Sequence, residues 1–291
     1  MALKPKLVIQ VDCDSEFVMQ KHYGLSSYKG DTYYSALEIF VDKFKKADLK
    51  GTLFVVGRDM EKKSVQPYIL NALKEGHEIA NHSYGHPNKF STLADKNFQT
   101  EVQKTNHIVY SAFRIKCKGF RAPNFDINPS QIKILETEGF QYDCSIIKTP
   151  YLPVIKLLKG IDASKSGYMG NKQLALRKYN SGGIIRIPIT TFPYMNFPCH
   201  FSYLLASNVN IAELIMTKLI KWHIKNRKPL IYLFHLADLV DNSFLYGTEL
   251  KYYKSLEKRL LLLDSFIKMV AASFESITTG EYCGSLKSGG A

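Results

Sequence analysis

The sequence lacks the features that would divide the chain into parts. Its 291 residues contain no linker rich in Pro, Gly or Ser, no low-complexity tract and no repeat of fixed period. Hydrophobic residues make up 45% of the chain, which is enough to bury one large core. We therefore expect residues 1–291 to form a single domain.

Long apolar runs are missing as well. No uncharged apolar stretch approaches the roughly 20 residues that a membrane-spanning helix needs. The N-terminal stretch also lacks the apolar segment and the small-residue cleavage site of a signal peptide. We therefore expect a cytoplasmic protein, and peripheral contact with the inner membrane stays open.

Cysteine is scarce and unpaired in its spacing. The five cysteines form an odd, scattered set with no CxxC pair: Cys13, Cys117, Cys144, Cys199 and Cys283. This pattern argues against a disulfide framework and against a thiolate zinc site, and it predicts buried free thiols.

Positive charge is in excess, with 39 Lys and Arg against 26 Asp and Glu and a net charge of +13. The lysines are spread along the chain and no recognised nucleic-acid motif is present, so no nucleic-acid partner is expected. Two interpretations stay open: a basic face that attracts an anionic membrane or a phosphate-bearing lipid, or simply a lysine-rich proteome.

Apolar runs typical of strands alternate with helical periodicity along the chain. Strands are predicted at 6–11, 52–56, 77–82, 119–123, 140–145, 183–189 and 230–235. Helices are predicted at about 31–47, before Gly76, and at 95–113, 129–138, 209–226 and 250–272. This alternation predicts the α/β class, with about seven parallel strands in a closed or nearly closed (β/α) barrel. Two excursions, at about 148–182 and 192–206, are either packed loops or a rim that faces substrate or membrane.

Two groups of polar side chains follow predicted strands. His82 and His86 stand four residues apart in HEIANHSYGHP, a spacing at which two imidazoles can bind one metal ion. Asp12 and Asp14, at the end of the first strand, should point to the same side of it. Two adjacent carboxylates are costly unless a cation or an arginine neutralises them, so one can bind a metal and the other can act as a base.

Arg121 and His235 also close predicted strands. Each alone has an ordinary explanation, as an arginine paired with a surface acid or as a capped core histidine.

Taken together, D-x-D, HEIANHSYGHP, RAP, YDCS and LFH resemble the motifs of the polysaccharide deacetylases of carbohydrate esterase family four, the NodB-homology group. The resemblance covers most of residues 6–240. It implies a distorted (β/α) barrel of about seven strands, with a metal held by one aspartate and two histidines.

The resemblance also implies a role for each matching residue. Asp14, His82 and His86 would bind a divalent metal, with Zn²⁺ favoured over Co²⁺, Ni²⁺ or Mn²⁺. Asp12 would be the general base and Arg121 its positioning partner. His235 would be the general acid, with Asp143 as the acid that supports it.

Three departures from the common motif pattern bear on these roles. Cys13 separates the two aspartates, as in the branch with the Helicobacter-type peptidoglycan deacetylase and the lipid-linked amino-sugar deformylases, so Asp12 and Asp14 could exchange roles. Asn124 replaces the usual tyrosine, although the backbone N–H that serves the oxyanion is retained. Asp238, after the last motif, could support His235 or contact substrate.

The expected activity is metal-dependent removal of an N-acyl group, favouring acetyl, from an amino sugar. The substrate would be a glycan or an amino sugar on a phosphorylated lipid carrier. Hydrolysis of a non-sugar amide or cyclic imide is one alternative, and a non-catalytic metal-binding or glycan-binding module is another. A nucleic-acid binder driven by charge would instead bind oligonucleotides in a salt-sensitive way.

Overall fold

The structure is a computed structural model that describes residues 3–14, 18, 32–151, 183–241 and 255–288. Internal contacts divide the chain into two compact units. The first consists of Met1–Leu53, Lys62–Ile79 and Cys199–Tyr282, and the second of Phe54–Glu61, Ala80–Pro198 and Cys283–Ala291. The prediction of a single domain over 1–291 stays a prediction.

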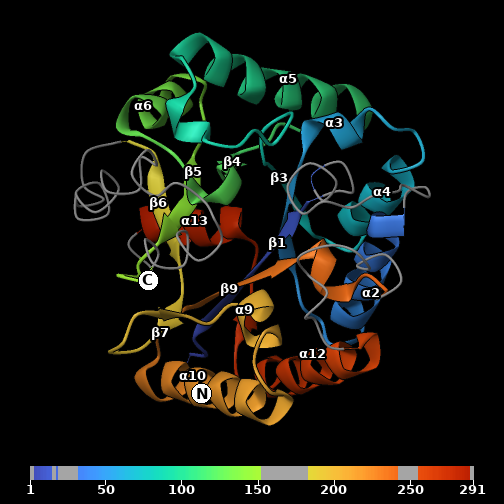
Figure 1. Ribbon diagram of the computed structural model, residues 1–291, viewed down its shortest axis with the longest axis vertical. Helices are drawn as coiled ribbons and strands as arrows, with labels where there is room; N and C mark the ends of the chain where they lie inside the picture. Colours follow the sequence, from blue (N-terminus) through green and yellow to red (C-terminus); the bar gives the residue numbers. More distant parts are fainter. Residues whose placement is uncertain (1–2, 15–17, 19–31, 152–182, 242–254, 289–291) are drawn as a thin grey trace. The chain divides into compact units, whose positions relative to one another are not determined.

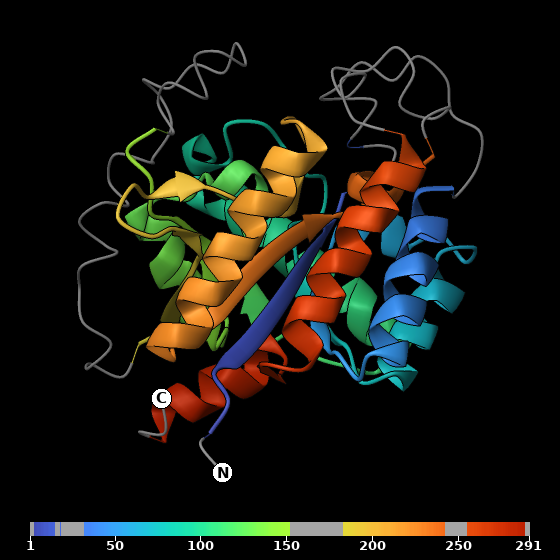
Figure 2. The same cartoon turned by 90° about the horizontal axis from the view of Figure 1, so that it is seen from below.

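In the first unit, the described residues form two long parallel strands covered by helices. Strand β1 pairs in parallel with β9 and, at its start, with the short β10. The strands are β1 (Lys6–Cys13), β9 (Leu230–His235) and β10 (Glu275–Ser276), and the helices are α2 (Thr32–Lys46), α4 (Gln66–Lys74), α9 (Phe201–Leu205), α10 (Val209–Asn226) and α12 (Leu256–Ala271). A 3₁₀ turn, η4 (Leu236–Leu239), follows β9 directly. Figure 2 shows β1 and β9 running side by side between helices α10 and α12.

The second unit also alternates strand and helix. Its strands pair in parallel from β3 to β4, β5 and β6. They are β4 (Gly119–Phe120), β5 (Tyr142–Ile147), β6 (Ile185–Ile189) and the hairpin β7 (Thr191–Phe192) with β8 (Phe197–Pro198); the helices are α3 (Gly57–Met60), α5 (Asp95–Phe113) and α6 (Pro129–Thr137), with 3₁₀ turns η1 (Phe90–Thr92) and η2 (Pro123–Phe125). Strands β2 (Gly51–Val55) and β3 (Glu78–Asn81) and helix α13 (Thr279–Lys287) each contribute residues to both units.

Hydrogen bonds join the strands of the main sheet in the order β10-β1-β2-β3-β4-β5-β6, with β9 beside β1 (Figure 1). Every described pairing in this sheet is parallel. The predicted α/β class with parallel strands is therefore confirmed.

Strand β1 shows why these residues form a central strand. Its apolar residues Leu7, Val8, Ile9 and Val11 are fully buried, as expected of a strand covered on both faces. Burying each such side chain stabilises the fold by about 1.5–3 kcal/mol. Gln10, the polar exception in this run, donates from Nε2 to Thr279 Oγ1 at 3.3 Å, which satisfies its buried amide.

The start of α6 follows from local sequence chemistry. Pro129 occupies the first turn, where its missing N–H costs nothing. The side chain of Asn128 accepts from Gln131 N at 2.9 Å, and the Gln131 side chain accepts from Asn128 N at 3.1 Å. This reciprocal capping box satisfies two N–H groups that the helix itself leaves without partners.

Two sequence expectations differ from the structure. The strand predicted at 119–123 ends at Phe120, because Pro123 has no N–H for a ladder and starts the 3₁₀ turn η2. The excursion at 192–206 is not loop throughout, since it contains the β7–β8 hairpin and α9. Of the excursion predicted at 148–182, residues 152–182 lie outside the described part of the chain.

The cysteine prediction is confirmed, because all five cysteines are buried and are thiols rather than halves of a disulfide. Within the described ranges, no helix is both long enough and apolar enough to cross a membrane.

Candidate metal centre and active site

The ends of β1 and β9 bring an acid and a histidine together in the first unit. Asp12 and His235 are register partners on the two parallel strands. His235 Nε2 lies 3.7 Å from Asp12 Oδ2, and the Asp12 side chain is almost fully buried. Asp14 follows at the next position on the same side of the strand and is also buried. The residues predicted as base and acid thus lie beside each other at the ends of their strands.

In the second unit, β3 ends at Asn81, and the two histidines lie in the turn that follows. Asn81 is fully buried, and its Oδ1 accepts from Ser83 N at 2.8 Å. Ser83 and His86 both have positive φ, at 63° and 45°. Residues other than glycine rarely adopt this backbone conformation. Ser83 Oγ accepts from His86 N at 3.1 Å. Two hydrogen bonds therefore connect Asn81, Ser83 and His86 along the turn.

Glu101 on α5 fixes the middle of this turn. Its Oε2 accepts from the backbone N–H groups of Tyr84 at 2.9 Å and Gly85 at 2.8 Å. Charge-assisted bonds of this kind are about twice as strong as neutral ones. Helix α5 therefore stabilises the turn that carries His82 and His86.

The tautomer of His82 follows from its hydrogen bond. Nδ1 lies 2.8 Å from the carbonyl oxygen of Arg121, and a carbonyl can only accept, so Nδ1 carries the proton. Nε2 is then the lone-pair nitrogen available to a metal. The His82 and His86 rings meet edge to face, with centroids 5.1 Å apart.

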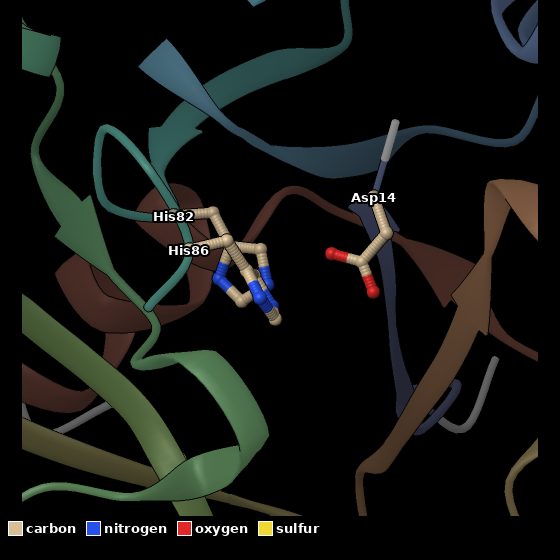
Figure 3. A group of neighbouring side chains, drawn as sticks. All are labelled: Asp14, His82 and His86. Carbon is tan, nitrogen blue, oxygen red and sulfur yellow. The ribbon is translucent and has the colours of Figure 1, made fainter. Parts of the chain in front are cut away.

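Asp14, His82 and His86 form a candidate metal centre. Each can offer one ligand atom, these atoms all lie within 4.8 Å of one another, and all three residues are buried. Figure 3 shows the two imidazoles side by side with the Asp14 carboxylate pointing toward them. Two nitrogens and one oxygen fit a catalytic zinc site, which keeps three protein ligands and an open fourth position.

Arg121 is fully buried behind this turn. Its Nε donates to the carbonyl of Cys144 at 3.2 Å, and its guanidinium lies 4.2 Å from the centroid of the Phe54 ring. These contacts with an aromatic face and a carbonyl oxygen stabilise the position of the guanidinium. Its action on Asp12 stays a prediction.

Asp143 is fully buried on β5 and pairs with Arg186 on β6, with 2.6 Å between Oδ2 and Nε. Its Oδ1 accepts from the hydroxyl of Ser145 at 2.5 Å and from the backbone N–H of Ser145 at 3.2 Å. Ser145 Oγ in turn accepts from Ala122 N at 2.7 Å, beside Arg121. Neither Arg186 nor Ser145 was identified from the sequence, because no predicted role was attached to either residue. The predicted support of His235 by Asp143 stays a prediction.

Asn124 lies in the 3₁₀ turn η2, is exposed, and has φ 54° and ψ 22°. Asparagine tolerates this left-handed conformation better than most residues, which gives a physical reason for its place here. The oxyanion role of its N–H stays a prediction.

Asp238 and Ser202 surround His235. Ser202 Oγ lies 2.7 Å from His235 Nδ1 and donates to Asp238 Oδ1 at 2.7 Å, while the other oxygen of Asp238 accepts from His235 N at 2.8 Å. Complete burial raises the pKa of Asp238, although the charge of His235 and these hydrogen bonds act in the opposite direction. Sequence reasoning missed Ser202, because a serine in FSYLL matches no motif.

The comparison with protein families matches part of this chain. Residues 31–142 match the family described as polysaccharide deacetylase. The predicted resemblance is confirmed. The matched range contains His82, His86, Arg121 and Asn124, whereas Asp12, Asp14 and His235 lie outside it.

A curated relative agrees with this match. Over 101 residues the chain is 32% identical to a peptidoglycan-N-acetylglucosamine deacetylase of Bacillus cereus. The aligned segment spans 34% of this chain and 35% of that protein, so the chain covers about a third of the relative's length.

Solved structures extend the similarity of fold to almost the whole chain. A structure from Mycobacterium smegmatis assigned to the polysaccharide deacetylases covers 99% of this chain and 92% of its own, with a TM-score of 0.63 and 14% identity. A family-four pseudoenzyme from Bacillus anthracis covers 96% of this chain and 66% of its own, with a TM-score of 0.55 and 14% identity. These matches confirm the predicted NodB-like (β/α) barrel fold.

Proposed function

We propose that this protein is a metal-dependent N-deacetylase that acts on an amino sugar within a glycan or a glycan precursor. The observation that carries the proposal is the group of Asp14, His82 and His86, three buried side chains whose ligand atoms lie within 4.8 Å of one another. The match of residues 31–142 to the polysaccharide deacetylases supports the same reaction class.

The donor set fits a divalent cation, with Zn²⁺ favoured because it prefers imidazole and carboxylate ligands in a three-ligand catalytic site. When bound, such a metal lowers the pKa of water from about 16 towards 7 and polarises a carbonyl group. Asp14 and the two histidines would hold it, and the hydrogen bond from His82 Nδ1 to Arg121 O orients one of them.

The remaining steps belong to the chain's own side chains. Asp12 accepts the proton of the attacking water, and Arg121 serves as its positioning partner. The Asn124 N–H donates to the oxyanion. His235 delivers a proton to the departing amine. His235 Nε2 and Asp12 Oδ2 are 3.7 Å apart, which places the general acid and the general base at the same end of the two paired strands.

The substrate class follows from the relatives and from the charge. The Bacillus cereus relative is named for peptidoglycan N-acetylglucosamine, so an N-acetylated amino sugar is the first choice. A net charge of +13 would also favour an amino sugar on a phosphorylated lipid carrier in the cytoplasm.

Metal content and turnover test the proposal together. Asp14→Asn, His82→Ala and His86→Ala should each lose bound metal and fall to the background rate of amine release. His107→Ala is the matched control, because His107 is an exposed histidine on α5, and it should keep both properties. Purified protein without bound metal after zinc supplementation would contradict the metal site.

Three substrates separate the remaining functions: N-acetylglucosamine oligomers, peptidoglycan fragments and an N-acyl amino sugar on a polyprenyl phosphate. Turnover of the last alone identifies a lipid-linked precursor. Bound zinc without turnover of any of the three would indicate a binding module, a function compatible with a fold that a pseudoenzyme shares.

A further inference from the structure

The aromatic excursion at 192–206 places a serine beside His235. Helix α9 starts at Phe201, whose fully buried ring packs against Phe234 of β9 with centroids 4.9 Å apart. His200, which precedes the helix, is buried with its ring centroid 5.9 Å from that of His235. Ser202 is therefore held by neighbours on both sides, and its position relative to His235 is set by packing.

Ser202 completes a hydrogen-bonded chain with a defined direction. Its hydroxyl donates to Asp238 Oδ1 at 2.7 Å, so the oxygen of that hydroxyl is left to accept. That oxygen lies 2.7 Å from His235 Nδ1. With the Ser202 hydroxyl hydrogen directed at Asp238, a proton on Nδ1 completes the chain by donating to the Ser202 oxygen.

The carboxylate of Asp238 contacts the His235 ring through Ser202. Its second oxygen, Oδ2, accepts from the backbone N–H of His235 at 2.8 Å. Arg259, also fully buried, donates to the carbonyl oxygen of Asp238 at 2.8 Å and to that of Val240 at 2.6 Å. These bonds hold the turn η4 in place, and Ser202 is the link from the carboxylate to the ring.

A proton fixed on Nδ1 determines the state of the other ring nitrogen. Nε2 is then the nitrogen that gains and loses a proton, and it is the one that lies 3.7 Å from Asp12 Oδ2. In metal-binding and catalytic histidines generally, the hydrogen-bond partner of one ring nitrogen determines whether the other nitrogen carries a proton.

We propose that Ser202 is a positioning residue for the deacetylase reaction, which links the Asp238 carboxylate to His235 Nδ1 and thereby directs the working nitrogen, Nε2, toward Asp12. This inference rests on the proposed function for its catalytic meaning, but the hydrogen-bonded chain exists in the resting protein. The excursion thus contributes a functional side chain to the end of β9.

The resting protein provides the first test. Long-range ¹H–¹⁵N correlation spectra report which nitrogen of each histidine carries the proton, and His235→Asn assigns the signals of His235. The native protein and Ser202→Thr, which keeps the hydroxyl, should show His235 with its proton on Nδ1. Ser202→Ala should show an increased population with the proton on Nε2. An unchanged tautomer in a folded Ser202→Ala protein would overturn the proposal.

Asp238→Asn and a matched serine control complete this test. An amide can accept through only one of its two head atoms, so Asp238→Asn should also disturb the tautomer of His235. Ser265 on α12 donates to Glu213 at 2.9 Å on the exposed side of the unit. Ser265→Ala removes a serine–carboxylate bond of the same kind and should leave the His235 signals unchanged.

Turnover supplies the second test, on the N-acyl sugar that the protein hydrolyses. Because a positioned general acid contributes roughly 10²–10⁴-fold, Ser202→Ala should lower kcat by about ten- to a hundredfold with little change in KM, and Ser202→Thr should restore most of it. An equal fall in the threonine variant would overturn the proposal. Absence of turnover in the native protein would count against the proposed function, while the tautomer measurement would still decide the role of Ser202.

Discussion

Removal of the Asp143 carboxylate should destabilise the protein strongly, because it leaves a buried cation without its partner. Asp143 is fully buried, the Arg186 side chain is only 11% exposed, and the two atoms of the ion pair are 2.6 Å apart. Breaking a buried pair by removing one partner costs about 3–5 kcal/mol. In Asp143→Ala, the Ser145 hydroxyl also loses an acceptor, which adds about 1–3 kcal/mol if no other acceptor replaces it.

This loss is a large share of the roughly 5–15 kcal/mol that stabilises a typical domain. Asp143→Asn, which keeps the shape and one acceptor, should therefore be measured beside Asp143→Ala. The double variant Asp143→Ala with Arg186→Met should recover much of the loss, because it removes the stranded charge. Urea unfolding followed by circular dichroism gives the free energies of unfolding for all of these proteins.

An exposed ion pair serves as the control. Lys43 and Asp264 lie 2.5 Å apart, but the Asp264 side chain is 52% exposed, so Asp264→Ala should cost no more than about 1 kcal/mol. The reasoning about burial would be refuted if Asp143→Ala cost as little as Asp264→Ala. A double variant no more stable than Asp143→Ala would refute the role assigned to the buried Arg186 charge.

Three further predictions follow from single contacts. Glu101→Ala should weaken zinc binding by about 10–100-fold in a competition titration, because the backbone N–H groups of Tyr84 and Gly85 lose the carboxylate that accepts from them. Equal affinity in the variant would contradict this. Burial lowers the pKa of His77, whose Nδ1 accepts from Gly51 N at 3.0 Å. The unfolded chain thus binds the proton more tightly, and the unfolding free energy should fall as pH drops below about 6.5, less steeply in His77→Asn. Gly119→Ala would place a Cβ atom 1.9 Å from Tyr142 Cζ, so its urea midpoint should fall by the equivalent of at least about 1–3 kcal/mol, and a wild-type midpoint would show that the ring can move aside.

The fold could be predicted well because its signals are local. The apolar run of β1 and the helical periodicity of 95–113 each fall within one element, and the structure has β1 at Lys6–Cys13 and α5 at Asp95–Phe113. The short elements were missed for the same reason. Strand β10 and the β7–β8 hairpin strands have two residues each, too few for any periodicity to show.

The ligand set could also be predicted, because its residues lie in short motifs. Strand alternation places Asp12 and Asp14 on one side, and HxxxH places two imidazoles within one turn. The structure groups Asp14 with both histidines. The groups that hold these residues could not be predicted, because Glu101 contacts a turn 16 residues before it and Ser202 contacts a histidine 33 residues after it.

The sequence by itself determined the α/β alternation, the family resemblance and the three side chains of the candidate metal centre. Each of these depends on residues close together in the chain or on motifs in a fixed order. The tertiary structure alone decided which ring nitrogen of His82 faces a carbonyl oxygen, that Arg186 pairs with Asp143, and that Ser202 lies between Asp238 and His235. Hydrogen bonds and ion pairs act over about 3 Å, and only folding brings groups from separate elements within that range.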